Sequence, residues 1–74
     1  MKVAIFDQER RLFDDQAFQV SLPGVEGVFA VLDFHAPLIS LLTTGEILLN
    51  GKYLPIKRGI AMVHRNELLV LVER

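Results

Sequence analysis

The sequence predicts an all-β fold, a small two-sheet β-sandwich or flattened barrel of about 8 to 10 short, mostly antiparallel strands. Turn signals recur about every 8 to 12 residues, which is the spacing typical of such folds. No window of about 11 residues keeps the three-to-four spacing of an amphipathic helix. Because 74 residues are too few for two separate cores, the chain is expected to form one domain.

The first two strands are indicated by apolar runs between polar breaks. Residues 3–6 (Val-Ala-Ile-Phe) form the first run, and the polar residues 7–11 close it. Leu12-Phe13 comes next and is predicted to end at a second polar break, residues 14–16 (Asp-Asp-Gln). Two adjacent acids at such a break are expected to shape a turn and not to share a catalytic task, since neighbouring side chains point apart.

The clearest strand surrounds Val20. Phe18, Val20 and Leu22 alternate with polar residues, the period-two pattern of a strand with one buried face. Phe18 is therefore expected in the core, where truncation to alanine would cost about 3 to 5 kcal/mol. Pro23-Gly24 is expected to end the strand, with glycine supplying the positive φ of a type II turn.

The next two strands follow in close succession. Residues 28–32 (Val-Phe-Ala-Val-Leu) are apolar at every position, which predicts a strand covered on both faces. A loop over residues 33–37 then leads into the apolar run 38–42 (Leu-Ile-Ser-Leu-Leu). Phe34 stands out in that loop as a large apolar side chain between strands, a position that contact with another protein would explain.

Turn chemistry marks the last strands. Asn50-Gly51 is the strongest hairpin signal, because a type I′ turn needs positive φ at both positions. The facing pairs are then Leu49 with Lys52 and Leu48 with Tyr53. Pro55 cannot donate to a ladder, so its strand is expected to lie at an edge of the sheet or to carry a bulge at Pro55. Residues 60–63 and 68–72 are expected to form the final hairpin around Arg65-Asn66.

Composition indicates a protein partner. Hydrophobic residues make up 51% of the chain even without glycine, against about 45 to 50% in average counts that include it. A small sandwich has too little interior for so many apolar groups, so an apolar patch is expected on the surface. The net charge of −1 without a basic stripe argues against nucleic acid as a partner. No uncharged stretch approaches the about 20 residues of a membrane span, and no signal peptide is visible, so a soluble domain is expected.

No residue pattern indicates an enzyme, a metal site or a bound cofactor. His35 and His64 lie far apart and lack cysteine or acidic neighbours at ligand spacing. The serines and histidines form no nucleophile arrangement, and the glycines at 24 and 27 open no helix that would cradle a phosphate. A small-ligand site would need a pocket that a chain of this size can barely enclose.

Several motifs, in a fixed order, carry a family resemblance. They are Leu-Phe-Asp at 12–14, Leu-Pro-Gly-Val-Glu-Gly at 22–27, His-Ala-Pro-Leu at 35–38, Thr-Gly-Glu-Ile at 44–47 and Asn-Glu-Leu-Leu-Val-Leu at 66–71. Together they resemble the N-terminal β-sandwich domain of the epsilon subunit of F-type (rotary) ATP synthase, over essentially the whole chain. Asp33-Phe34 departs from the family pattern, which usually has Pro-Gly before the histidine.

The resemblance implies a non-catalytic rotor subunit of the central stalk that couples ion flow to ATP synthesis. Its implied partners are the gamma subunit and the c-subunit ring, at the cytoplasmic side of the bacterial plasma membrane. Carried over by position, the residues toward the c ring are Glu26, Gly27 and Val28. Those toward gamma are Phe34, His35, Ala36, Pro37, Ile39 and Ser40.

Typical family members continue into a two-helix C-terminal domain that this sequence does not include, either by nature or because it is cut there. That domain holds the ATP site and the inhibitory latch of many members, so neither nucleotide binding nor such a latch is expected here. The alternative interpretation is a free-standing β-sandwich interaction module of another assembly, since a fold alone does not fix a function.

Overall fold

The computed structural model describes all 74 residues and consists of nine strands joined by short turns and loops. The strands are β1 (Lys2–Phe6), β2 (Arg11–Gln16), β3 (Gln19–Gly24), β4 (Gly27–Leu32), β5 (Leu38–Leu42), β6 (Gly45–Leu49), β7 (Lys52–Ile56), β8 (Arg58–His64) and β9 (Glu67–Glu73). There is no helix with the length and hydrophobicity that a membrane crossing requires.

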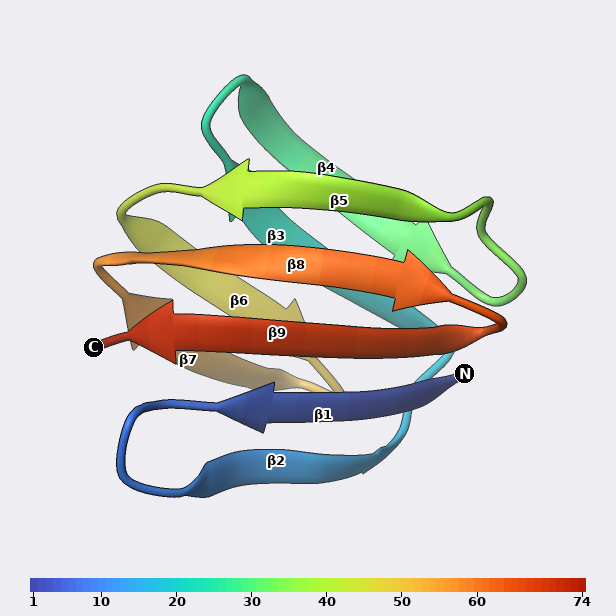
Figure 1. Ribbon diagram of the computed structural model, residues 1–74, viewed down its shortest axis with the longest axis horizontal. Coiled ribbons are helices and arrows are strands. Elements are labelled where there is room, and N and C mark those ends of the chain that lie inside the picture. Colours follow the sequence, from blue (N-terminus) through green and yellow to red (C-terminus); the bar gives the residue numbers. More distant parts are fainter.

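The strands form two layers of one continuous sheet. In Figure 1, β5, β8, β9, β1 and β2 make the front layer, and β4, β3, β6 and β7 cross behind them. The layers are joined where Gly24 of β3 pairs with Leu42 of β5. All ladders are antiparallel except that of β1 with β9, which is parallel. The prediction of a small, mostly antiparallel β-sandwich is therefore confirmed.

The core lies between the two layers and is entirely apolar. Every second residue of β1, β3, β6, β8 and β9 points into it, because side chains alternate between the faces of a sheet. The largest fully buried side chains are Ile5, Leu22, Ile47, Leu68, Val3, Val20, Val31 and Val70. Since no polar side chain is buried, packing of apolar groups is what holds the layers together.

The predicted hairpin turns are confirmed. Asn50 and Gly51 have φ angles of 48° and 73°, and Leu49 pairs with Lys52 as expected. Arg65 and Asn66 also have positive φ and close the β8–β9 hairpin. Pro55 lies in β7, which pairs only with β6 and is an edge strand. Its missing N–H therefore costs no ladder bond.

The prediction that Phe18 belongs to the core is wrong, since 83% of it is exposed. Alternation begins only at Gln19, where β3 starts, and Phe18 itself lies in a bend. Ala17 takes the inward place next to Met1, and its amide donates to the Met1 carbonyl. The bend shifts the side-chain period by one residue, so Val20 and Leu22 point inward and Phe18 points to solvent.

Three further predictions also need correction. Residues 28–32 are not covered on both faces, because β4 pairs only with β3 and leaves Val28 and Leu32 exposed. Pro23-Gly24 is part of β3, and the turn is made by residues 25 and 26, with the positive φ at Gly27. Residues 14–16 continue β2 and do not interrupt it.

Candidate partner-binding surface

A groove opens between β4 and β5, beside the point where Gly24 of β3 and Leu42 of β5 join the two layers. It has a volume of about 550 Å³, and its floor is the hairpin turn between β3 and β4. Val28 and Phe29 line it from β4, and Ile39, Ser40 and Leu41 line it from β5. Val28 is 76% exposed and Ile39 is 73% exposed, so the groove offers apolar surface to a partner.

Gly24 shapes the inner end of this groove. A side-chain carbon on Gly24 would lie 2.8 Å from the carbonyl oxygen of Gly27 and 2.8 Å from the Phe29 ring. Only glycine leaves space for that ring over the hairpin. The half-buried Phe29 thereby seals the core below the groove, while Val28 beside it stays at the surface.

The loop that joins β4 to β5 presents Phe34. Phe34 has a φ of 61° and is 82% exposed. Its amide donates to Oδ1 of Asn66 at 2.7 Å, and the His35 amide donates to the Leu32 carbonyl at 3.1 Å. Asp33 is held by an ion pair with the amino group of Met1. These contacts fix the loop, so the exposure of Phe34 belongs to an ordered surface.

The structure divides the sequence-predicted contact residues into two places. Glu26, Gly27 and Val28 share the groove with Ile39 and Ser40. Phe34 lies at the opposite end of β4, and Ala36 and Pro37 lie exposed in the same loop. His35 is half-buried, and its Nδ1 lies 2.6 Å from the Ala36 carbonyl. The residues assigned to the c ring and two of those assigned to gamma are thus neighbours in space.

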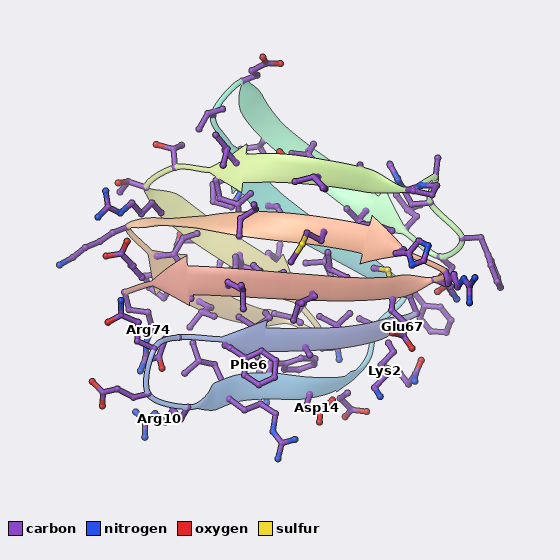
Figure 2. All side chains as sticks on the ribbon, in the orientation of Figure 1. Lys2, Phe6, Arg10, Asp14, Glu67 and Arg74 are labelled. Carbon is purple, nitrogen blue, oxygen red and sulfur yellow. The ribbon has the colours of Figure 1, made fainter.

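A second apolar surface was not foreseen from the sequence. The registers of β5, β8, β9 and β1 align two rows of apolar side chains on the outer face of the front layer. The rows are Ile39, Met62, Leu69 and Ala4, and Leu41, Ile60, Leu71 and Phe6. Figure 2 shows the Phe6 ring beside β1. The sequence does show that these strands are apolar on both faces, but it does not show which strands lie side by side.

Some of the charged residues outside these surfaces pair with one another. Arg58 pairs with Glu73 at 2.5 Å, and this hydrogen bond lowers the pKa of Glu73 and raises that of Arg58. The pKa of Asp7 is lowered first by hydrogen bonds from the Glu9 and Arg10 amides, and further by Arg74. The Arg58–Glu73 pair is exposed and Asp7 is half-buried beside Arg74, and both pairs lie at the ends of strands, which favours a structural role. No group of three His, Asp or Glu side chains is arranged to hold a metal.

The fold and the surface define an all-β domain with apolar side chains exposed on its surface. Comparison with known proteins names its family. The whole chain, residues 1–74, matches the family described as the ATP synthase delta/epsilon chain, beta-sandwich domain, and the chain belongs to that family. Membership confirms the family resemblance and the expectation of a non-catalytic subunit.

Individual relatives agree with this assignment. The chain is 41% identical over 76 residues to the chloroplastic ATP synthase epsilon chain of Trieres chinensis, which covers 97% of this chain and 57% of the relative. It is 36% identical over 75 residues to the ATP synthase epsilon chain of Gloeobacter violaceus, covering 96% and 57%. The chain therefore spans about half the length of these relatives.

Solved structures share the fold. A chain in the cryo-EM structure of the Tetrahymena thermophila mitochondrial ATP synthase central stalk and c-ring superposes with a TM-score of 0.85 at 12% identity, covering 99% of this chain and 63% of that one. A chain of the Euglena gracilis mitochondrial ATP synthase gives the same TM-score at 18% identity, covering 97% and 49%. At these identities the likeness concerns the fold.

Proposed function

We propose that this chain is a central-stalk subunit of an F-type ATP synthase rotor that binds the gamma subunit and the c-subunit ring. In this role it couples ion flow to ATP synthesis without catalysing a reaction. The family match over all 74 residues carries the proposal. The domain has a close-packed core, which resists compression. Such stiffness suits a rotor subunit that transmits torque.

Contact with gamma is assigned to Phe34, His35, Ala36, Pro37, Ile39 and Ser40. The exposure of Phe34 and Ile39 supports this, because neither side chain finds cover within the domain. Phe34→Asp is expected to leave the isolated chain folded and to weaken its co-purification with gamma. Tyr53→Asp, a similar change to an exposed aromatic residue on β7, serves as the matched control. Equal loss in both variants, or unfolding of the Phe34 variant, would contradict this assignment.

Contact with the c ring is assigned to Glu26, Gly27 and Val28. The chain has no cysteine, so a single introduced cysteine gives an unambiguous crosslink. Glu26→Cys is expected to crosslink to a c subunit in assembled synthase, and Tyr53→Cys is not. A crosslink of Glu26→Cys to another subunit alone would refute the assignment.

We also propose that the domain binds no nucleotide and acts peripherally at the cytoplasmic side of a bacterial plasma membrane. A thermal-shift titration with ATP is expected to leave Tm unchanged, and a saturable rise would contradict the first statement. Membrane fractionation of the native host checks the second. Relatives include chloroplastic chains, so a plastid location is the competing result.

A further inference from the structure

Three strands of the sheet pair on one side only, and β5 meets β3 on its second side at Leu42 alone. The residues along these edges differ. β2 and β7 end the path of paired strands, and β4 branches from it through β3 alone. β2 carries Arg11, Asp14 and Asp15, and its register with β1 is interrupted by a bulge. β7 carries Lys52 and Pro55. Charges, bulges and proline are the features that prevent an edge from pairing with another chain.

The edge of β4 has none of these features. Its sequence is Gly-Val-Phe-Ala-Val-Leu, without a charged residue or proline. An exposed, apolar and regular edge of this kind is a template for a further strand. β2 and β7 carry features that prevent pairing with another chain, and β4 does not. Of these three edges, β4 is therefore the one suited to pair with a further strand.

Along β4, residues that hydrogen-bond to β3 alternate with residues that do not, and this alternation shows which backbone groups are free. Pro23 has no N–H, and its carbonyl accepts from Thr43, so Pro23 and Val28 form a non-hydrogen-bonded pair. Pairs alternate along an antiparallel ladder, so Ala30 and Leu32 also point their backbone groups away from β3. The Leu32 carbonyl is used by the His35 amide. Both groups of Val28, both of Ala30 and the amide of Leu32 therefore face the open side.

β5 also directs backbone groups toward the groove, away from β8. The Leu41 carbonyl points away from β8 and accepts from the Val25 amide. Because the direction of the backbone groups repeats every two residues, those of Ile39 also point away from β8. Side chains of Val28 and Ile39 flank the space between the two edges. Glu26 is the one charged residue that lines the groove, and it has no ion-pair partner in the structure.

We infer that the edge of β4 binds an extended strand of a partner protein, by addition of that strand to the back layer. Backbone groups at Val28, Ala30 and Leu32 supply the hydrogen bonds. The groove takes apolar side chains at alternate positions of the incoming strand, and Glu26 favours a basic residue beside the hairpin turn. This inference rests on the proposed function and takes gamma as the protein that supplies the strand. The gamma strand runs along the backbone edge of β4 from the Phe34 loop and ends at Val28, beside the hairpin turn, so Glu26 and Gly27 lie where gamma and the c ring meet.

Two proline substitutions test the inference with the same chemical change on two edges. Ala30→Pro removes an outward N–H and leaves the ladder with β3 intact, since Ala30 makes no hydrogen bond to that strand. Tyr53→Pro does the same on β7, where Tyr53 shares the outward phase of Pro55. Affinity for purified gamma is expected to fall about tenfold or more with Ala30→Pro. With Tyr53→Pro it is expected to change less than about twofold.

Hydrogen exchange gives a direct reading of strand pairing. In the free chain the amides of Val28 and Ala30 are expected to exchange rapidly, while those of Phe29 and Val31 are protected by β3. In the complex with gamma, the amides of Val28 and Ala30 are expected to become protected. Should Ala30→Pro fail to fold, Ala30→Lys blocks the same edge by its charge and keeps the N–H.

The outcomes separate this inference from the proposed function. If gamma binds but Val28 and Ala30 stay unprotected and Ala30→Pro binds normally, the strand pairing is wrong and the rotor assignment stands. If the unaltered chain does not bind gamma, both are wrong. If ultracentrifugation shows that the free chain forms a dimer that Ala30→Pro abolishes and gamma does not displace, the occupant is a second copy and the inference is overturned.

Discussion

The sandwich leaves its sheet open on two sides, and the two sides have opposite character. Where β2 and β7 lie, Leu12, Phe13 and Leu54 pack against the core and close the gap with side chains. Where β4 and β5 lie, Val28, Ile39 and Leu41 stand exposed around a groove. One side is closed within the domain, and the other leaves large apolar side chains exposed, as interaction surfaces do.

The two sides also show where the apolar surplus of the chain lies. In a two-layer sandwich, only the side chains on one face of each strand point into the core. The remaining apolar side chains gather on β4, β5 and the outer face of the front layer and are sparse on β2. We expect the closed side to govern stability and the open side to govern association.

A matched pair of isoleucines gives the largest expected contrast. Ile56 on β7 is 4% exposed and Ile39 on β5 is 73% exposed. Ile56→Ala is expected to lower the free energy of unfolding by about 2 to 5 kcal/mol, through lost burial and the cavity left behind. Ile39→Ala is expected to stay within about 0.5 kcal/mol. Urea unfolding of both variants measures this, and equal losses would show that the two sides do not differ in their contribution to stability.

Gly24 tests whether the inner end of the groove is as tight as the structure shows. Gly24→Ala is expected to cost about 1 to 3 kcal/mol, because the new methyl group meets the Gly27 carbonyl and the Phe29 ring. A neutral effect in thermal or urea unfolding would mean that Phe29 can move aside. Gly51→Ala is the control: the added methyl group meets no neighbour, and only the positive φ opposes it.

Phe18 is expected to behave as a surface residue. Phe18→Ala should change the free energy of unfolding by no more than about 0.5 kcal/mol, since little of the ring is buried. The sequence pattern alone predicted a loss several times larger. Urea unfolding distinguishes the two, and a large loss would show that the bend before β3 does not persist in solution.

The smallest effect is expected at the exposed pair of Arg58 and Glu73. Because the pKa of Glu73 is lowered in the folded state, its stabilising contribution is present above the ordinary value of 4.5 and is lost as pH falls through the folded-state pKa. Glu73→Gln should therefore flatten the fall of Tm below about pH 4.5, most clearly at low salt. Identical acid profiles for both proteins would show that the pair does not persist in solution.

Much of the fold follows from local chemistry, which is why it could be predicted. Asn50-Gly51 permits one kind of turn, and that turn sets the register of β6 and β7. Pro55 restricts its strand to an edge. Errors arose where alternation was extended through a bend at Phe18, and where an apolar run was assumed to be covered because it is apolar. Both depend on which strands meet in space, and no single segment contains that information.

The candidate surface shows the same limit. Phe34 was singled out because a large apolar side chain in a loop is unusual, and its exposure agrees with that reasoning. The apolar rows on the front layer were missed because they combine residues from β5, β8, β9 and β1, whose neighbours are fixed by long-range pairing. The free edge of β4 was missed for the same reason.

The parallel pairing of β1 with β9 also bears on how the protein is made. Lys2 lies beside Glu67 in the finished sheet, as Figure 2 shows. At synthesis rates of about 5 to 20 residues per second, β1 leaves the ribosome several seconds before its central partner exists. During that interval it can pair only with β2 in a hairpin, which is marginally stable by itself. Until β9 is made, β1 therefore lacks the strand that joins it to β8 and the rest of the front layer.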